Sequence, residues 1–212
     1  MIHFKKEMQE DDDRIAVQQV PETWEFEKLA LAGHLAEGTT DFTLSIRQAT
    51  VAIERGRGAR FISIEANDAE NWTVAENYIR QTNQGRGRMD FGFFGKSGYP
   101  DCAKVYVPFG YQGAIKIVLL NRSALHIDGL NLGSLDVTAR GHGKVTIGQV
   151  HTSGQLTLHC EQNGVITAEL VSCRSLSAEK SADCTGDGVS IKRLLVTAGA
   201  RDQAGTPMEL RA

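Results

Sequence analysis

The segment Gly141-His-Gly-Lys144 has a composition that could hold a phosphate group. A phosphate-binding loop also needs a glycine ahead of its Gly-Lys pair and a serine or threonine directly after it, because backbone amides cradle the phosphates and the hydroxyl binds the metal. This chain has Thr138 and Val145 at those two places. The segment is therefore expected to be a tight corner between strands.

Three other glycine-containing segments carry charged side chains. Thr185-Gly-Asp-Gly188 resembles part of a calcium loop, but it occurs once and lacks flanking ligands. Gly56-Arg-Gly58 and Gly85-Arg-Gly-Arg88 resemble arginine-glycine segments that grip RNA. Two short copies in a chain of balanced charge favour the tips of β-hairpins instead.

The six histidines show no metal-binding spacing. No two of them lie four residues apart, and the His-Glu-x-x-His motif is absent. His126 and His159 fall at outward positions of predicted strands, so each is expected to face solvent or to pair across strands.

Signatures of nucleophilic and sugar-cleaving enzymes are also missing. There is no Gly-x-Ser-x-Gly elbow. Cys160 falls in the inward register beside Leu156 and Leu158, which favours a small buried filler over a nucleophile. Sugar cleavage needs two carboxylates that converge on one groove, whereas the carboxylates of this region do not align in one stripe. They are Asp128, Asp136, Glu161, Glu169 and Glu179.

These observations predict a non-enzymatic protein without catalytic, cofactor-binding or metal-binding residues, and they leave the binding residues unassigned. The four cysteines are Cys102, Cys160, Cys173 and Cys184. A chain of this size in a reducing compartment needs no disulfide, and no Cys-x-x-Cys pair supports a zinc site.

The totals of the chain limit its partners. Its 212 residues include 23 basic and 26 acidic ones, for a net charge of −3, which argues against nucleic-acid binding and against attraction to anionic membranes. No apolar run is long enough to span a bilayer, so no membrane insertion is expected. The start lacks the apolar core of a secretory signal. A cytoplasmic location is expected, or an extracellular or periplasmic one if a leader has been removed.

A repeat of about twenty residues in the second half of the chain must position these side chains. Three columns of apolar residues recur, with a step of 20 or 21 residues that widens to 23 once. The columns are Ile115, Leu135, Leu156, Leu176; then Leu125, Val145, Ile166, Val189; then Leu130, Val150, Val171, Leu194. Self-similarity at this period is the mark of stacked coils.

The residues between the aligned apolar ones are mainly polar, as in Thr157 and Thr146. Because side chains alternate along a strand, the apolar ones are expected to point inward and the polar ones outward. Asn121-Arg-Ser123 and Asn163-Gly164 suit corners, and the longer corner Cys184–Gly188 explains the step of 23. Each coil is expected to contain two short strands and two corners, with coils stacked about 4.8 Å apart.

The predicted fold is all-β: a short two-sheet parallel β-solenoid with coils of about 20 residues and an irregular, strand-rich N-terminal half. The signature of a leucine-rich repeat is absent, and an antiparallel meander stays an alternative. Residues 21–200 are expected to form one domain with regular coils at 114–198, between a polar lead-in at 1–20 and a C-terminal tail at 201–212.

Alternation predicts several strands in the N-terminal half. The clearest are at 41–64 and 104–108; residues 22–37 favour a strand over a helix, and 72–81 fit either. Met89, Phe91 and Phe93 alternate as well.

Val105-Tyr-Val-Pro108, then Ile115-Lys-Ile117, then repeats with a glycine before the next strand resemble the bacterial β-strand-repeat family of adhesin-like proteins, also called the toast-rack domain. The resemblance covers about residues 40–198 and implies a β-solenoid without catalytic residues to carry over. Many members lie outside the membrane behind a leader or membrane helix, and some accompany envelope-stress sensors. This chain shows neither anchor, which favours an intracellular or leaderless version.

The first functional hypothesis is an interaction or assembly module that binds a protein partner or self-associates, because stacked coils present open terminal edges. The alternative is a carbohydrate-binding or carbohydrate-active protein that uses one sheet face. That alternative needs clustered aromatic and acidic residues, whereas the outward columns contain mainly Thr, Ser and His. RNA binding through the two Arg-Gly segments ranks third.

Overall fold

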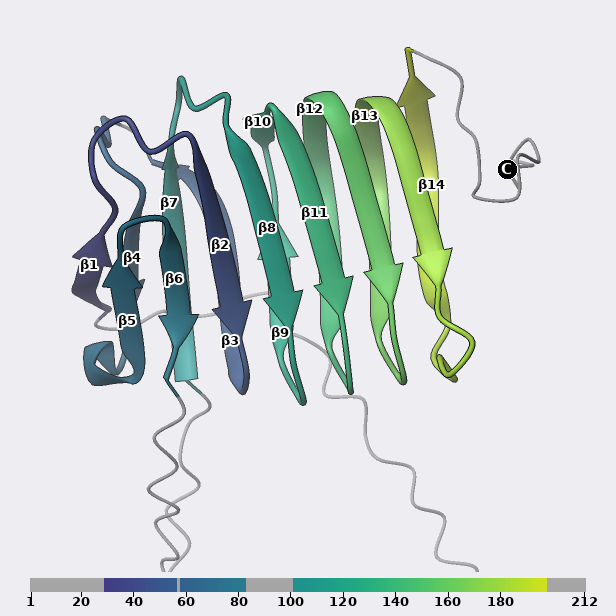
Figure 1. Ribbon diagram of the computed structural model, residues 1–212, viewed down its shortest axis with the longest axis horizontal. Coiled ribbons are helices and arrows are strands. Elements are labelled where there is room, and N and C mark those ends of the chain that lie inside the picture. The colour runs from purple at the N-terminus through teal and green to yellow at the C-terminus, as the bar shows by residue number, and fades with distance from the viewer. Residues whose placement is uncertain (1–28, 57, 83–100, 198–212) are drawn as a thin grey trace, which may run out of the picture.

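The computed structural model of the protein describes residues 29–56, 58–82 and 101–197 (Figure 1). The strands of this part of the chain belong to one sheet of 14 strands, and the only helical segment is the short 3-10 turn η1 (Ala69–Asn71). The predicted all-β class is confirmed.

The repeat region forms seven strands, and equivalent strands of successive repeats lie side by side along the long axis of the molecule (Figure 1). They are β8 (Ala114–Leu119), β9 (Ala124–Ile127), β10 (Leu130–Leu132), β11 (Ser134–Ala139), β12 (Lys144–Cys160), β13 (Val165–Lys180) and β14 (Gly188–Val196). We call one passage of the chain down the front of Figure 1 and back up its far side a winding.

Neighbouring windings pair in parallel, and their register is the one that the repeat predicts. Leu135 pairs with Ile115 on one side and with Leu156 on the other, and Leu156 pairs with Leu176. The other two columns, from Leu125 to Val189 and from Leu130 to Leu194, are paired in the same way. The predicted columns are thus confirmed as ladders.

The prediction of two short strands and two corners in every coil is wrong. β12 and β13 run through the second corner as continuous bent strands of 17 and 16 residues. Gly129, at φ 65°, and Gly133 interrupt the chain between β9, β10 and β11. In the later windings neighbouring strands bend at the same level, so hydrogen bonding continues around the bend with only a local shift of register. The ladders therefore belong to one sheet instead of two.

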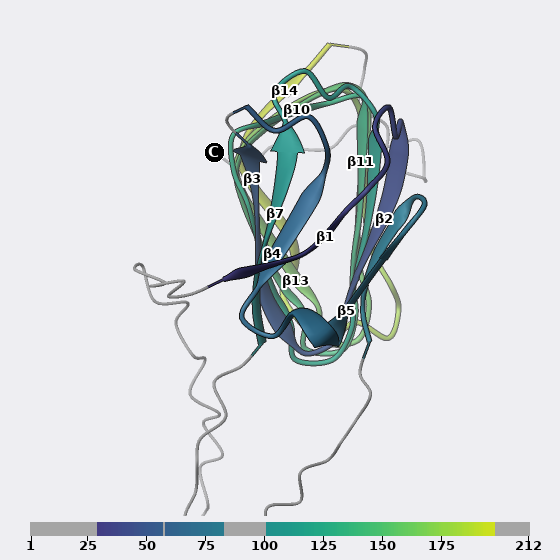
Figure 2. The same ribbon diagram turned by 90° about the vertical axis from the view of Figure 1, so that its left-hand side faces the viewer.

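The core lies between the two sides of the folded sheet, as the view along the stack shows (Figure 2). The core contains the residues of the first column and the residues two positions after them. Of the latter, Ile117, Val137 and Leu158 are all fully buried. Buried and exposed side chains alternate along most of these strands, because each strand has one face on the core and one in solvent.

In the N-terminal half, β2 (Asp41–Ile46) and β3 (Ala49–Gly56) form another winding, with Phe42, Leu44 and Ile46 buried on β2 and Val51 and Ile53 buried on β3. β2 pairs in parallel with β8, and β3 with β9. On their other side lie β6 (Tyr78–Gln81) and β7 (Asp101–Pro108), also parallel. β2 and β3 therefore lie between strands that all come later in the sequence.

Antiparallel strands end the stack on this side. β4 (Ser63–Ala66) pairs with β7, β1 (Ala30–His34) pairs with β4, and β5 (Trp72–Ala75) pairs with β6. Figure 2 shows β1 crossing the end of the stack. The ambiguous segment 72–81 is a hairpin of β5 and β6 with Glu76 at φ 42°, and the strand predicted within 22–37 is present as β1.

The lead-in at 1–20, the tail at 201–212 and the alternating Met89–Phe93 segment lie outside the described residues.

Candidate functional site

One rim of the stack consists of four-residue turns at the same position in successive windings, along the lower edge of Figure 1. The turns are residues 120–123, 140–143, 161–164 and 181–184. The last three close through backbone amides of Gly143, Gly164 and Cys184, which donate to the carbonyl oxygens of Arg140, Glu161 and Ser181 at 3.2, 3.0 and 2.9 Å.

The second residue of the first three turns has a left-handed backbone. The φ angles are 57° at Asn121, 70° at Gly141 and 56° at Gln162. Glycine adopts this conformation freely and asparagine more readily than most residues. Because equivalent residues stack on one another, their side chains form rows along the rim.

An open groove of about 740 Å³ follows this rim and crosses five windings. Four of its side chains make no hydrogen bond or ion pair with any other described residue: Asn121, Arg122, His142 and Gln162. Amide, guanidinium and imidazole groups can bind hydroxyl groups of a ligand. No Phe, Tyr or Trp is among the groove's lining residues.

Asp183 supplies a negative charge near the β14 end of the groove. The Ser181 hydroxyl donates a hydrogen bond of 2.5 Å to its carboxylate, and this bond, with backbone amides and the nearby Arg140, holds the pKa of Asp183 below its usual value. Arg122 lies in the same groove. The groove thus carries fixed charges of both signs and has no strong preference for a charged ligand.

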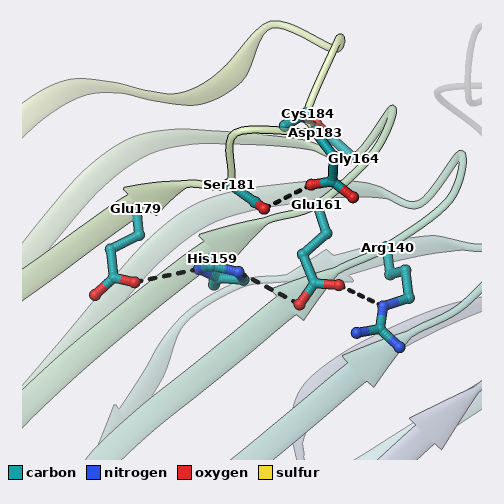
Figure 3. Close-up of polar contacts among 8 residues, drawn as sticks. All are labelled: Arg140, His159, Glu161, Gly164, Glu179, Ser181, Asp183 and Cys184. Atoms are coloured by element: carbon teal, nitrogen blue, oxygen red, sulfur yellow. Dashed lines mark hydrogen bonds and ion pairs between the residues drawn. The ribbon is translucent and has the colours of Figure 1, made fainter.

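Beside the groove, the side chains of Arg140, His159, Glu161 and Glu179 form a row across the windings (Figure 3). The ring nitrogens of His159 lie 3.3 Å from Glu161 and 3.4 Å from Glu179, and Arg140 Nε donates to the other oxygen of Glu161 at 2.5 Å. Because both ring nitrogens face carboxylates, His159 is not placed to take a proton from a serine or cysteine. The row links neighbouring windings and forms no nucleophile–base pair.

The other predicted polar residues lie apart. His126 is exposed on β9, as expected. Asp128 accepts a hydrogen bond from the Gln149 amide, and Lys ammonium groups lie close to Asp136 and Glu169. Of the five carboxylates singled out in the sequence, Glu161 and Glu179 share a partner.

All four cysteines are free thiols. Cys160 is fully buried, and burial together with the neighbouring Cys184 raises its pKa to about 11. The thiol is therefore protonated at neutral pH, as a buried filler would be.

Two of the glycine motifs lie at corners of the windings. Gly141–Lys144 contains the turn between β11 and β12, so the predicted corner is confirmed. Thr185–Gly188 contains the extra residues of the last corner, where the hydroxyl of Thr185 donates to Asn163. Among the described residues, no three His, Cys, Asp or Glu side chains gather as a metal site. Gly56 ends β3, which pairs with β7 and β9 and not with the following strand β4, so the predicted hairpin tip at Gly56–Gly58 is wrong. Gly85–Arg88 lies outside the described residues.

The second candidate site is the end of the stack at β14. Within the described chain this strand pairs only with β13. Ile191, Leu194 and Val196 are only partly buried, and Leu195 is 60% exposed. No other described strand covers the outer edge of β14, and an uncovered edge strand is a template for pairing with another chain.

Sequence reasoning missed the groove because it treated the turn residues only as corners. The signal was present: Asn121, Gly141 and Gln162 occupy one position of the repeat, and so do Arg122, His142 and Asn163.

Comparison with known proteins gives little further information. No family model matches the chain, and no curated protein matches it. A solved structure of a "putative cell adhesion protein" from Clostridium sporogenes ATCC 15579 is similar, at 12% identity and a TM-score of 0.43. The match covers 82% of this chain and 97% of the other. Across the described part of the chain, no helix is sufficiently long and apolar to pass through a bilayer.

Proposed function

We propose that the protein is a non-enzymatic interaction or assembly module, built as a short parallel β-solenoid. The observation that carries the proposal is the uncovered strand β14 at one end of the stack. Edge strands with free backbone groups and exposed aliphatic side chains recruit other polypeptides. In this proposal the stacked windings are a rigid support that presents the edge.

The resemblance to bacterial β-strand-repeat proteins agrees with this function and belongs to the proposal. So does a location in the cytoplasm, or outside the membrane behind a removed leader. The protonated Cys160 and the carboxylate-flanked His159 offer no nucleophile–base pair, which supports a binding role over a catalytic one.

Site-specific photo-crosslinking in the native host tests the proposal. A photoreactive amino acid replaces Leu195 on β14 in one variant and the exposed His126, in the middle of the stack, in a control. We expect polypeptide adducts at position 195 and few at 126. An absence of polypeptide adducts at 195, or equal yields at both positions, would contradict the proposal.

A second candidate function is binding of an uncharged polysaccharide. The rim groove favours it, because uncommitted polar side chains repeat there at the spacing of the windings. The groove lies on the corners and not on a sheet face, where the sequence-based alternative placed the site. No Phe, Tyr or Trp lines the groove, so a bound sugar would depend on hydrogen bonds, which compete with water in an open groove. This candidate therefore ranks second.

Affinity electrophoresis in gels that contain a soluble glucan, mannan or xylan separates the two candidates. We expect at least one polymer to retard the protein if the second function is right. The double variant Asn121→Ala/Gln162→Ala should then lose the retardation, whereas Asn131→Ala, at an exposed amide on β10, should keep it. Unretarded migration in all three gels would dismiss this candidate.

A further inference from the structure

We propose that a second copy of the chain covers the end at β14, with the two β14 strands antiparallel about a two-fold axis at Ser190. This inference rests on the proposed function, because it names the partner of the same edge. It follows from the state of the two ends of the stack and from the charges along β14.

The interior of the last winding lacks the cover that earlier windings have. Ile166 and Val171 on β13 are fully buried, and their partners Val189 and Leu194 on β14 are only partly buried. Ala178, at the end of β13, is also only partly buried, whereas its partner Leu158 is fully buried. The core columns therefore continue to the end of the stack and stop uncovered.

The opposite end cannot supply the cover. There β1 and β5 close the stack with antiparallel strands, and Leu35 and Trp72 are 1% and 6% exposed. β1 and β5 are in close contact, since a Cβ added to Gly33 would lie 2.9 Å from the Val74 side chain. A head-to-tail stack would have to join unlike ends. A pair of β14 ends is self-complementary, because a two-fold axis relates identical surfaces.

Lysine often protects an edge strand against such pairing. On β14, however, the Lys192 ammonium lies 2.6 Å from Glu169 Oε1 on its own neighbour β13. Lys192 therefore has an ion-pair partner within its own molecule.

The charges along the strand select the register. A two-fold axis at Ser190 places Val189 beside Ile191 of the other copy on the core side. The same axis places Asp187, the residue directly before β14, beside Arg193 of the other copy, and this pair occurs twice. Neither Asp187 nor Arg193 has an ion-pair partner among the described residues of its own chain. Opposite charges across paired strands stabilise pairing, and like charges weaken it.

Sedimentation equilibrium of the full chain over a range of micromolar concentrations tests the inference. We expect a monomer–dimer equilibrium. Arg193→Asp and Asp187→Arg should each raise the dissociation constant by about tenfold, because each creates two like-charge pairs. The double variant Asp187→Arg/Arg193→Asp should return it to within about threefold of the wild-type value. Arg122→Asp, the same change of charge in the rim groove, should have no effect.

Thermal unfolding below the dissociation constant should give the same midpoint for all variants, so that a loss of dimer is not a loss of folding. A full chain that stays monomeric throughout would overturn the inference, and so would larger polymers. A monomer that dimerises only when shortened to end at Thr197 would also overturn it, since the chain's own tail would then occupy the edge.

A dimer that the double variant fails to restore would overturn the proposed register. The photo-crosslinks distinguish this inference from the proposed function. Adducts between position 195 and a different protein would refute the dimer and would still agree with an interaction module.

Discussion

The side chain of Gln81 accepts hydrogen bonds that a backbone carbonyl accepts elsewhere in the stack. At the corner between β2 and β3, the backbone amides of Arg47 and Gln48 each lie 2.9 Å from Gln81 Oε1. Gln81 Nε2 donates in turn to Asp101 at 2.8 Å. At the corresponding place in the next winding, the amide of Leu120 donates to a backbone carbonyl. The side chain of Gln81, which is 1% exposed, completes the pattern where the regular stack ends.

Gln81→Leu should lower the free energy of unfolding by about 1–3 kcal/mol, because it leaves two partly buried backbone donors without their acceptor. Urea denaturation of the variant measures this loss. Gln155→Leu, at an exposed position of β12, is the matched control and should change stability by less than about 0.5 kcal/mol. Equal effects of the two substitutions would disprove the role of Gln81.

Ile147 and Thr146 are neighbours on β12 that face opposite sides of the sheet. Ile147 is fully buried and Thr146 is partly exposed. Ile147→Asp should unfold the chain, since it would bury an unpaired charge in the core. Thr146→Lys should leave the circular-dichroism spectrum and the melting temperature nearly unchanged. A folded Ile147→Asp variant would contradict the assignment of the core face.

The Cys160 thiol gives a pH dependence of stability with a definite sign. Its pKa is about 11 in the folded protein, against 9.0 for a free thiol. Between these values the unfolded chain has lost a proton that the folded protein keeps, so stability should fall as the pH rises from about 9 to 11. Denaturation between pH 8.5 and 10 should show a steeper fall for the wild type than for Cys160→Ala. Parallel curves would refute the raised pKa.

At the scale of elements, a glycine at the upper rim lets successive windings approach closely. The Gly133 amide donates to the Gly113 carbonyl at 2.9 Å, and a Cβ on Gly133 would lie 2.2 Å from the carbonyl oxygen of Gln112. Gln112 directly precedes Gly113 and Ala114, whose backbone groups are hydrogen-bonded to Gly133 and Thr40, so its oxygen cannot move aside without loss of these bonds. The corner before β11 therefore requires glycine.

Gly133→Ala should cost about 2–3 kcal/mol of stability, as expected when an added methyl group forces the backbone apart. Gly110→Ala is the matched control, because a Cβ there would meet nothing within 4 Å and its φ is not left-handed. Thermal denaturation compares the two. A Gly133→Ala variant as stable as Gly110→Ala would mean that the rim can relax.

The regular ladders could be predicted from the sequence because alternation and a constant period act together. Only one face of each strand is buried, so an apolar residue such as Val137 must lie on that face. A shift of the strand register by one residue would expose the whole apolar column. The winding of β2 and β3 could not be placed in this way. Phe42 pairs with Ile115, far outside the twenty-residue period, and the intervening strands change the order of the windings.

The continuous bend of β12 and the groove were not predictable for different reasons. The bend depends on hydrogen bonds to both neighbouring strands, which a single sequence does not display. The groove depends on the stacking of turns, so that Asn121 and Gln162, apart in sequence, share one surface. The stacking of the windings creates that surface, whereas the local sequence predicts only the conformation of each separate turn.

At the scale of the whole molecule, contacts run mainly between neighbouring windings, so stability should be nearly a sum over windings. A chain that ends at Lys180 lacks β14 and should still unfold cooperatively, with a smaller urea dependence because less surface is exposed on unfolding. A chain that ends at Thr197 is the control. An unfolded Lys180-ended chain would show that the last winding holds the stack together.

The order of the windings has a consequence for the protein while it is being made. β2 and β3 are made before all of their flanking partners, which are β8 and β9 on one side and β6 and β7 on the other. Until translation has passed Ile127, two aliphatic strands have at least one edge without its native neighbour. We expect wrong strand pairing to be most frequent in nascent chains of this length, and a chaperone to be most useful to them.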